Sequence, residues 1–103
     1  MVDGPRGFEP GRLVKSTAGR DRGRYFIVIR EIDERFCEVA DGDLRRLPRP
    51  KKKNKRHLQL QPHVATELAQ RWQQGQKVTN RDIRRAIQSL VPTEDDTPLP
   101  EGG

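Results

Sequence analysis

The apolar pattern of this chain changes its period at Pro62, and that change constrains the fold more than any other feature of the sequence. Before Pro62 the apolar residues come in short runs. The densest run, Tyr25–Ile29, consists of the β-branched and aromatic side chains that are typical of strands. After Pro62, the residues Val64, Leu68 and Trp72 recur every four positions, as on one face of a helix. The sequence therefore predicts a mainly β fold with a helical appendage.

Turn-forming residues divide the first part of the chain into predicted strands. The basic stretch 19–24 and the polar pair Asp33-Glu34 separate the first three strands, and Asp41-Gly42 is a dipeptide that favours a two-residue hairpin. The strands are predicted at 12–16, 25–29, 36–40, 43–47 and 57–60. Short strands spaced by turns favour a small five-stranded barrel or a sandwich, and closure into a barrel would remove exposed sheet edges.

The region 61–91 is predicted to form a hairpin of two helices. The first helix is expected to end near Gln73, because Gly75 provides a C-terminal stop. Thr79 and Asp82 have the spacing of a capping box. This box opens a second apolar stripe, which consists of Ile83, Ile87 and Leu90. The pattern leaves the role of the helices open.

Both ends of the chain are expected to lie outside the core. Residues 1–10 mix glycine and proline with charge, which predicts a flexible leader, and residues 92–103 predict a disordered acidic tail. The chain has 103 residues, of which 31% are hydrophobic. This leaves room for one small core.

Positive charge is concentrated in the first part of the chain. Residues 1–60 carry 16 basic and 9 acidic side chains, whereas residues 61–103 carry 5 and 6. Clustered cations favour a polyanionic partner, because every phosphate contacted releases counterions. Nucleic acid is the favoured partner. A membrane surface ranks second, because the basic stretch has neither an apolar helical face nor a lipidation signal.

Other classes of function find little support in the sequence. The single cysteine, Cys37, cannot form an intramolecular disulfide and suits a reducing compartment. The first thirty residues contain no apolar run of signal-peptide type, so a cytoplasmic protein is expected. Cys37 and His57 fall in different predicted strands, no third group orients them, and the two histidines form no zinc motif. We therefore expect no enzyme activity, no metal or other cofactor, and no small-molecule substrate.

The run from Gly11 to Phe26 resembles a KOW motif, the strand-loop-strand element of several ribosomal proteins and transcription elongation factors, with Gly23 at the position of its hallmark glycine. Extended through 40–47 and the Pro-Lys-rich stretch to Leu58, about half of the chain resembles bacterial KOW-domain RNA-binding proteins related to the fourteen-e large-subunit ribosomal protein. The resemblance implies an SH3-like barrel at 11–60 that contacts ribosomal RNA through its loops and a basic extension at 48–56. The loop here is rich in arginine where that family more usually has lysine, and the helices are not part of the motif.

The candidate RNA-binding residues form two groups. The first is the glycine-bracketed loop with Arg20, Arg22, Gly23 and Arg24, where guanidinium groups can grip phosphate. The alternative is a solvated hairpin in which Arg20 or Arg24 pairs with Asp21. The second group lies within residues 44–58, which contain no acidic residue to neutralise it, and consists of Arg45, Arg46, Arg49, Lys51, Lys52, Lys53, Lys55 and Arg56. Its alternatives are a self-repelling linker and a nuclear-localisation signal.

Three of the five aromatic residues raise the question of base stacking or partner binding. Tyr25 and Phe36 could stack on unpaired bases, although Phe36 is better explained as core. Trp72 is expected to be buried against the second helix. Since few stacking platforms exist, recognition of RNA shape and phosphate should outweigh base reading.

The leading hypothesis is a ribosome-associated protein that binds structured RNA, with ribosomal RNA favoured, in translation or ribosome assembly. In such a ribonucleoprotein the helices would dock on the barrel or on a neighbouring ribosomal protein. The alternative is a KOW-type protein-interaction module of the transcription elongation machinery. Duplex DNA binding is disfavoured, because no helix carries a dense basic face. The RNA target and the oligomeric state are left open.

Overall fold

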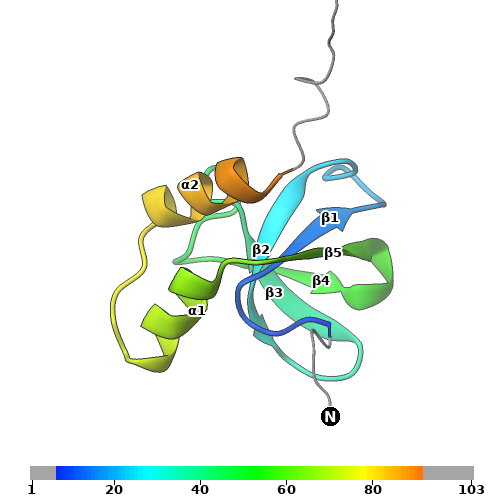
Figure 1. Cartoon of the computed structure of the whole chain (residues 1–103). Helices are drawn as coiled ribbons and strands as arrows, with labels where there is room; N and C mark the ends of the chain where they lie inside the picture. Colours follow the sequence, from blue (N-terminus) through cyan, green and yellow to red (C-terminus); the bar gives the residue numbers. More distant parts are fainter. Residues whose placement is uncertain (1–6, 92–103) are drawn as a thin grey trace, which may run out of the picture.

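The computed structural model describes residues 7–91, which form five antiparallel strands in one sheet and two helices (Figure 1). The elements are β1 (Arg12–Ser16), β2 (Tyr25–Glu31), β3 (Phe36–Ala40), β4 (Lys51–Asn54), the 3-10 turn η1 (Lys55–His57), β5 (Leu58–Val64), α1 (Thr66–Gln73) and α2 (Asn80–Leu90). The prediction of a mainly β fold with added helices is confirmed. The predicted acidic tail at 92–103 and the first six residues of the predicted leader lie outside the described residues.

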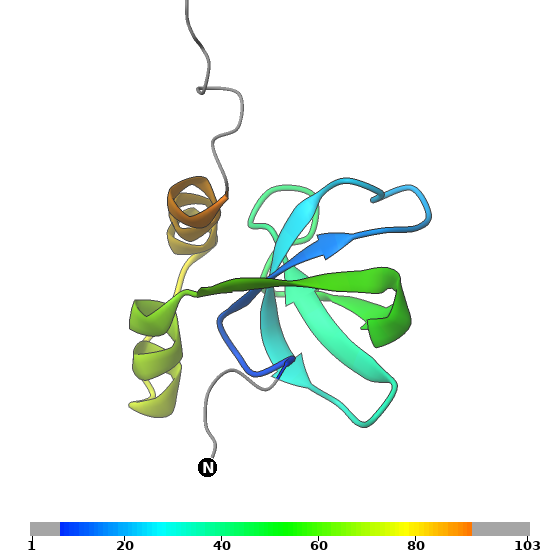
Figure 2. The same cartoon turned by 45° about the vertical axis from the view of Figure 1, so that its right-hand side comes forward.

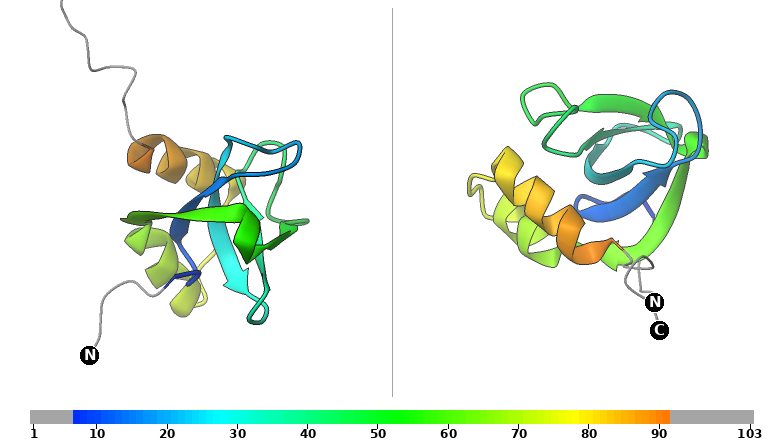
Figure 3. Two further views of the ribbon diagram at one scale, coloured as in Figure 1. Left: turned by 90° about the vertical axis from the view of Figure 1, so that its right-hand side faces the viewer. Right: turned by 90° about the horizontal axis from the view of Figure 1, so that it is seen from above.

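The strands follow the order β4-β3-β2-β1-β5, so β4 and β5 are the two edges of the sheet. The registers pair Val14 with Phe26 across β1 and β2, and Ser16 with Leu58 across β1 and β5. The sheet is strongly curled, as Figure 3 shows from above. It stays open nevertheless, because no ladder pairs the two edge strands in the described chain. Only the short turn η1 joins them.

The predicted fourth strand at 43–47 is wrong, and the actual fourth strand is Lys51–Asn54. The Asp41 carboxylate explains the difference, because one of its oxygens accepts hydrogen bonds from the backbone N–H groups of Asp43 (2.9 Å) and Arg45 (2.8 Å). The backbone N–H groups of Asp41 and Gly42 in turn donate to the carbonyl of Arg45. These bonds fold the chain into a compact loop and use the groups that a strand would need for its ladder.

The predicted basic extension at 48–56 is therefore not an extended arm. Its middle part is β4, which pairs with β3 in a register that places Cys37 opposite Lys53 and Val39 opposite Lys51. A strand of three lysines and one asparagine is tolerated here because it lies at a sheet edge, where Lys51 and Lys52 reach solvent. The third lysine, Lys53, is largely buried and pairs with Asp21 instead.

Both faces of the central strands are buried. One core, the inner core, lies on the concave side of the sheet and consists of Val14, Phe26, Val28, Cys37, Val39 and Leu58. The outer core lies between the sheet and the helices and consists of Leu13, Ile27, Ala65, Leu68, Val78 and Ile83. Consecutive residues of a strand point to opposite faces, so Phe26, Ile27 and Val28 alternate between the two cores. This double burial explains the uninterrupted apolar run of β2.

The helices cover one face of the sheet and share the outer core with β1 and β2 (Figure 2). In Figure 2, α1 is seen along its length while α2 is seen nearly end-on, so the two helices of the predicted hairpin cross. Trp72 is partly buried against the outer core, to which Ile83 of α2 contributes. Removing the helices would expose Leu13 and Ile27 on the sheet.

The first helix begins later than predicted. Pro62 lies inside β5, and the strand continues to Val64, which pairs with Arg12 instead of joining the helical stripe. Proline is tolerated at a sheet edge, where its missing N–H removes no ladder bond. The predicted capping box of α2 is confirmed, because the Thr79 hydroxyl accepts from the Asp82 N–H (3.1 Å) and the Asp82 carboxylate accepts from the Thr79 N–H (2.9 Å).

The predicted flexible leader is wrong for residues 7–10, which are held against the sheet by Arg12. The Arg12 side chain is only 2% exposed. Its guanidinium donates to the carbonyl of Gly7 (2.9 Å), to the carboxylate of Glu9 (2.8 Å) and to the carbonyl of Gln61 (2.9 Å). Phe8 thereby packs against the inner core. A buried guanidinium thus joins the start of the described chain to β1 and β5.

Neither of the two helices between residues 7 and 91 has the length and apolar character needed to cross a membrane.

Candidate nucleic-acid interface

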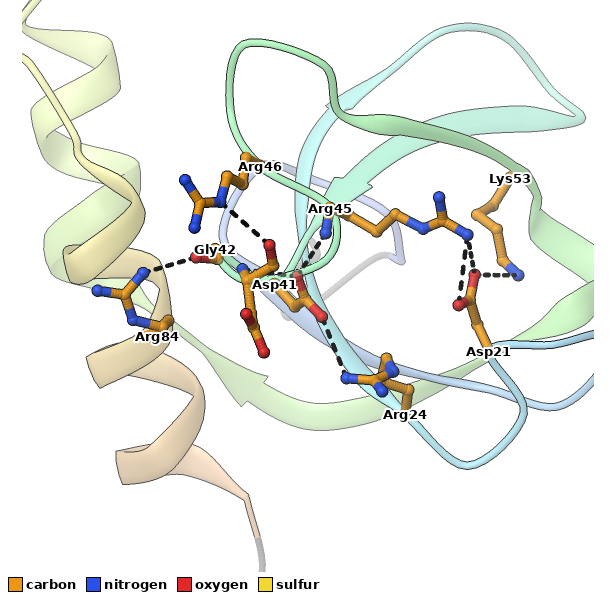
Figure 4. A network of polar contacts seen from close by, with 9 residues as sticks. Asp21, Arg24, Asp41, Gly42, Arg45, Arg46, Lys53 and Arg84 are labelled. Carbon is orange, nitrogen blue, oxygen red and sulfur yellow. Dashed lines mark hydrogen bonds and ion pairs between the residues drawn. The ribbon is translucent and has the colours of Figure 1, made fainter.

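All twelve predicted RNA-binding residues lie in three segments: the hairpin loop 17–24, the loop 41–50, and residues 51–57, which comprise β4 and η1. These segments contact one another. The Asp21 carboxylate of the hairpin loop lies 3.3 Å from the guanidinium of Arg45 and 3.7 Å from the ammonium of Lys53 (Figure 4). The Thr17 N–H of the same loop donates to the carbonyl of His57 (2.9 Å). We call these three segments together the basic surface.

The hairpin loop is closed by backbone hydrogen bonds that require glycine. Gly19 and Gly23 have φ angles of 77° and 85°, which side chains rarely adopt. The Gly23 N–H donates to the carbonyl of Ser16 (2.8 Å), and the Arg24 N–H donates to the carbonyl of Asp21 (2.9 Å). The backbone of the loop is therefore defined, while the side chains of Arg20 and Arg22 extend into solvent.

Neither Arg20 nor Arg24 pairs with Asp21, so the alternative of a hairpin neutralised within itself is wrong. Asp21 is buried and pairs with Arg45 and Lys53, from the other two segments. Arg24 instead lies 3.5 Å from the Asp41 carboxylate. The expectation that no acidic residue neutralises the second basic group is also wrong. Asp21 and Glu31 are distant from this group along the chain, but they lie beside it in space and pair with Arg45, Lys53 and Lys55.

The eleven cations among the predicted site residues fall into two sets. Those that pair with a carboxylate are Arg24, Arg45, Lys53 and Lys55, the last with Glu31 at the far end of β2. Those that are exposed and pair with no carboxylate of residues 7–91 are Arg20, Arg22, Arg46, Arg49, Lys51, Lys52 and Arg56. Seven cations are therefore available to an anionic partner.

Helix α2 fixes the loop 41–50 from the other side. The guanidinium of Arg84 donates to the carbonyl of Gly42 (2.6 Å), and the side-chain carbonyl of Asn80 accepts from the N–H of Leu47 (2.8 Å). Figure 4 shows Arg84 reaching the loop from the helix. The roles of Asn80, Arg84 and the buried Asp41 were not predicted, because nothing in the local sequence links positions so far apart.

None of the five aromatic side chains, all of which the structure describes, is classed as exposed. Tyr25 and Phe36, considered above for base stacking, are both half-buried. A lysine ammonium also lies over each ring, Lys15 at 5.4 Å from the Tyr25 centroid and Lys52 at 4.5 Å from the Phe36 centroid. The basic surface therefore offers cations and backbone rather than open aromatic platforms.

The residues considered for nucleophilic or metal chemistry lie apart. Cys37 is buried in the inner core and His57 is exposed at the end of η1. Between residues 7 and 91, no group of three or more His, Cys, Asp or Glu side chains is placed to hold a metal ion.

Burial raises the pKa of the Cys37 thiol from 9.0 to about 11, with a smaller upward contribution from Glu31 and an opposing one from Lys55. The thiolate fraction at pH 8 is then roughly a hundredfold lower than in the unfolded chain. We expect native protein to react with a thiol reagent such as DTNB at least about a hundred times more slowly than protein in urea. Equal rates in the two states would contradict the burial of Cys37.

A scan against models of protein families found no match for the chain, and a search of the curated proteins found none either.

Proposed function

We propose that this protein binds structured RNA through the basic surface, with ribosomal RNA as the favoured target, and that it acts in translation or ribosome assembly rather than as an enzyme. The observation that carries the proposal is the set of seven exposed cations without a carboxylate partner in the described chain, all on segments that contact one another. Such a set keeps its charge available for phosphate groups.

The chemistry of these side chains suits a phosphate backbone. Guanidinium groups can bind phosphate through two parallel hydrogen bonds, and lysines add point charges. Each phosphate that is neutralised releases counterions. If about six phosphates of a duplex were contacted, the affinity would fall roughly as the fifth power of the salt concentration.

Structured RNA is favoured over single strands, because single-strand binders stack bases on exposed aromatic side chains. Here Tyr25 and Phe36 are half-buried and each has a lysine over its ring. Recognition would then depend on the spacing of phosphates and on the shape of a folded RNA.

The same proposal assigns the sheet to the SH3-like KOW class. What supports the assignment is that β1, the hairpin loop and β2 form one strand-loop-strand unit, in which Gly23 adopts a φ of 85°. The protein departs from that class in the open order of its sheet and in its two helices, which complete the outer core.

The two most accessible arginines of the hairpin loop provide the test. In the double variant Arg20→Ala/Arg22→Ala, we expect about tenfold weaker binding of a fluorescein-labelled ribosomal RNA hairpin at low salt. We also expect a slope of log K against log salt that is smaller by about two, because each lost phosphate contact removes about one unit. Fluorescence anisotropy measures both quantities. The titrations span about 50 to 200 mM salt, the range over which phosphate contacts weaken.

The matched control is Arg81→Ala/Arg85→Ala, which removes two exposed arginines of α2 that lie outside the basic surface. Its affinity should stay within about twofold of the wild type, apart from the small effect of net charge. The proposal fails if wild-type protein does not bind structured RNA at low salt, or if both double variants weaken binding equally.

A further inference from the structure

Two buried aspartates lie among the cations of the basic surface, and they join its two loops reciprocally. Asp21 and Asp41 are each only 6% exposed. Asp21, in the hairpin loop, pairs with Arg45 of the loop 41–50, whereas Asp41, in the loop 41–50, pairs with Arg24 at the end of the hairpin loop (Figure 4). Each loop therefore supplies the carboxylate for an arginine of the other.

Asp21 brings three segments together. Its carboxylate lies 3.3 Å from Arg45 and 3.7 Å from Lys53, and the Lys53 ammonium also donates to the hydroxyl of Ser16 (3.2 Å). The Nε of Arg45 is buried and has no hydrogen-bond partner within the described residues. The direction of the Arg45 guanidinium is thus set at its other end, by Asp21.

Asp41 fixes the backbone that carries Arg45. One carboxylate oxygen accepts from the N–H groups of Asp43 and Arg45, and the other lies 3.5 Å from Arg24. The next residue, Gly42, is bound through its carbonyl by Arg84 of α2. The loop 41–50 is therefore held from the hairpin loop and from the helix at once.

We propose that Asp21 and Asp41 are positioning residues of the RNA-binding surface, which hold its two loops in a single arrangement before RNA arrives. This inference rests on the proposed function and deepens it. A surface whose loops are already ordered pays less conformational entropy on binding than one whose loops must be ordered by the ligand. The exposed arginines that these two loops carry, such as Arg22 and Arg46, then meet the RNA from a fixed backbone.

The proposal predicts a change in RNA affinity that is opposite in sign to the change expected from charge alone. Neutralising an acidic residue makes the surface more positive, which by charge alone strengthens the binding of a polyanion. If the carboxylates position the loops, Asp21→Asn and Asp41→Asn should instead each weaken binding of the RNA hairpin, by about tenfold.

Asp43→Asn is the matched control, because Asp43 lies in the same loop and adds the same charge when neutralised. Its side chain is exposed and makes no hydrogen bond or ion pair with the rest of residues 7–91. We expect this variant to bind RNA as tightly as the wild type or up to about twofold more tightly. The positioning role is overturned if Asp21→Asn and Asp41→Asn bind RNA as tightly as Asp43→Asn.

A measurement without RNA distinguishes positioning from a general loss of stability. In the full chain, Asp21→Asn should accelerate amide hydrogen exchange at Gly23 and Arg24, whose N–H groups donate to the carbonyls of Ser16 and Asp21 and close the loop. Exchange in the middle of β1 and β2 should be unchanged. Unchanged exchange at Gly23 and Arg24 would also overturn the proposal. Binding is measured well below the thermal midpoint of each variant. Should Asp21→Asn fail to fold, Asp41→Asn carries the test, because its amide oxygen can still accept the hydrogen bonds of Asp43 and Arg45 while the ion pair with Arg24 is lost. Exchange at Gly23 and Arg24 should then accelerate, and unchanged exchange there would overturn the proposal.

A failure of the proposed function can be distinguished from a failure of the positioning role. If the wild type itself does not bind structured RNA, the proposed function fails, and the assignment of positioning residues fails with it. If the wild type binds RNA in a salt-dependent manner and the three asparagine variants do not differ, only the positioning role is wrong.

Discussion

Replacing Gly42 by alanine should destabilise the protein by about 3 to 5 kcal/mol, from the sum of backbone strain and steric overlap. Gly42 has a φ of 77°, a conformation that costs an alanine about 1 kcal/mol or more. A Cβ atom there would also lie closer than 3.0 Å to the backbone carbonyl oxygen of Asn80 and 2.9 Å from Cγ of Arg84. Since the first of these atoms is backbone, α2 would have to move away from the loop 41–50. Urea unfolding measures the loss.

Gly19 provides a control with the same backbone angle. Its φ is also 77°, but a Cβ atom would meet nothing within 4 Å. Gly19→Ala should therefore lower the free energy of unfolding only by the cost of the backbone conformation, about 1 kcal/mol. Similar losses of stability in the two variants would contradict the close packing of Gly42 on α2.

The second large effect is expected at Arg12. Arg12→Met should lower the free energy of unfolding by about 3 kcal/mol, because it removes the donor that satisfies two carbonyl groups and leaves the Glu9 carboxylate without its partner. Methionine keeps much of the apolar volume, so the loss reports mainly on the hydrogen bonds of the guanidinium. We expect residues 7–10 to lose their protection from amide exchange in this variant, because Arg12 binds Gly7 and Glu9 directly.

Arg30→Met is the matched control. Arg30 pairs with Glu38 at 2.8 Å, the same distance as Arg12 and Glu9, but the Arg30 side chain is 67% exposed. Pairs at the surface contribute at most about 1 kcal/mol, so this variant should be nearly as stable as the wild type. If the two arginine variants lose equal stability, burial is not what makes the Arg12 network important.

The contribution of the Arg12 and Glu9 pair should also depend on pH. Burial acts to raise the pKa of Glu9. The hydrogen bond and charge of Arg12, together with backbone hydrogen bonds of Glu9 and Gly7, outweigh this effect and hold that pKa below its ordinary value of 4.5. A carboxyl whose pKa is lowered by folding stabilises the protein above its ordinary pKa and loses that contribution as the pH falls through the folded value. The difference between Arg12→Met and the wild type should therefore shrink in acid.

Much of the fold was predictable because its signals are local. The β-branched run at Tyr25–Ile29 predicted β2, and the spacing of Thr79 and Asp82 predicted the start of α2, since a capping box needs only residues within one turn of a helix. The clustering of basic residues between positions 20 and 56 was likewise visible in the sequence. These features depend on residues close together along the chain.

The errors arose where a side chain bonds to backbone or where distant segments meet. Asp41-Gly42 predicted a two-residue hairpin, but the Asp41 carboxylate captures the N–H groups of Asp43 and Arg45 and closes a loop instead. Pro62 looked like a boundary, but the edge position of β5 makes its missing N–H harmless.

What the sequence by itself determined is therefore the mainly β character of the chain, its change to helices, and its excess of positive charge in the first part. Only the tertiary structure decided which cations remain available, because Asp21 neutralises Arg45 and Lys53 across more than twenty positions of sequence. It also decided that Arg12 is buried rather than exposed. The physical reason is that ion pairing and burial depend on distance in space, which the order of residues along a chain does not specify.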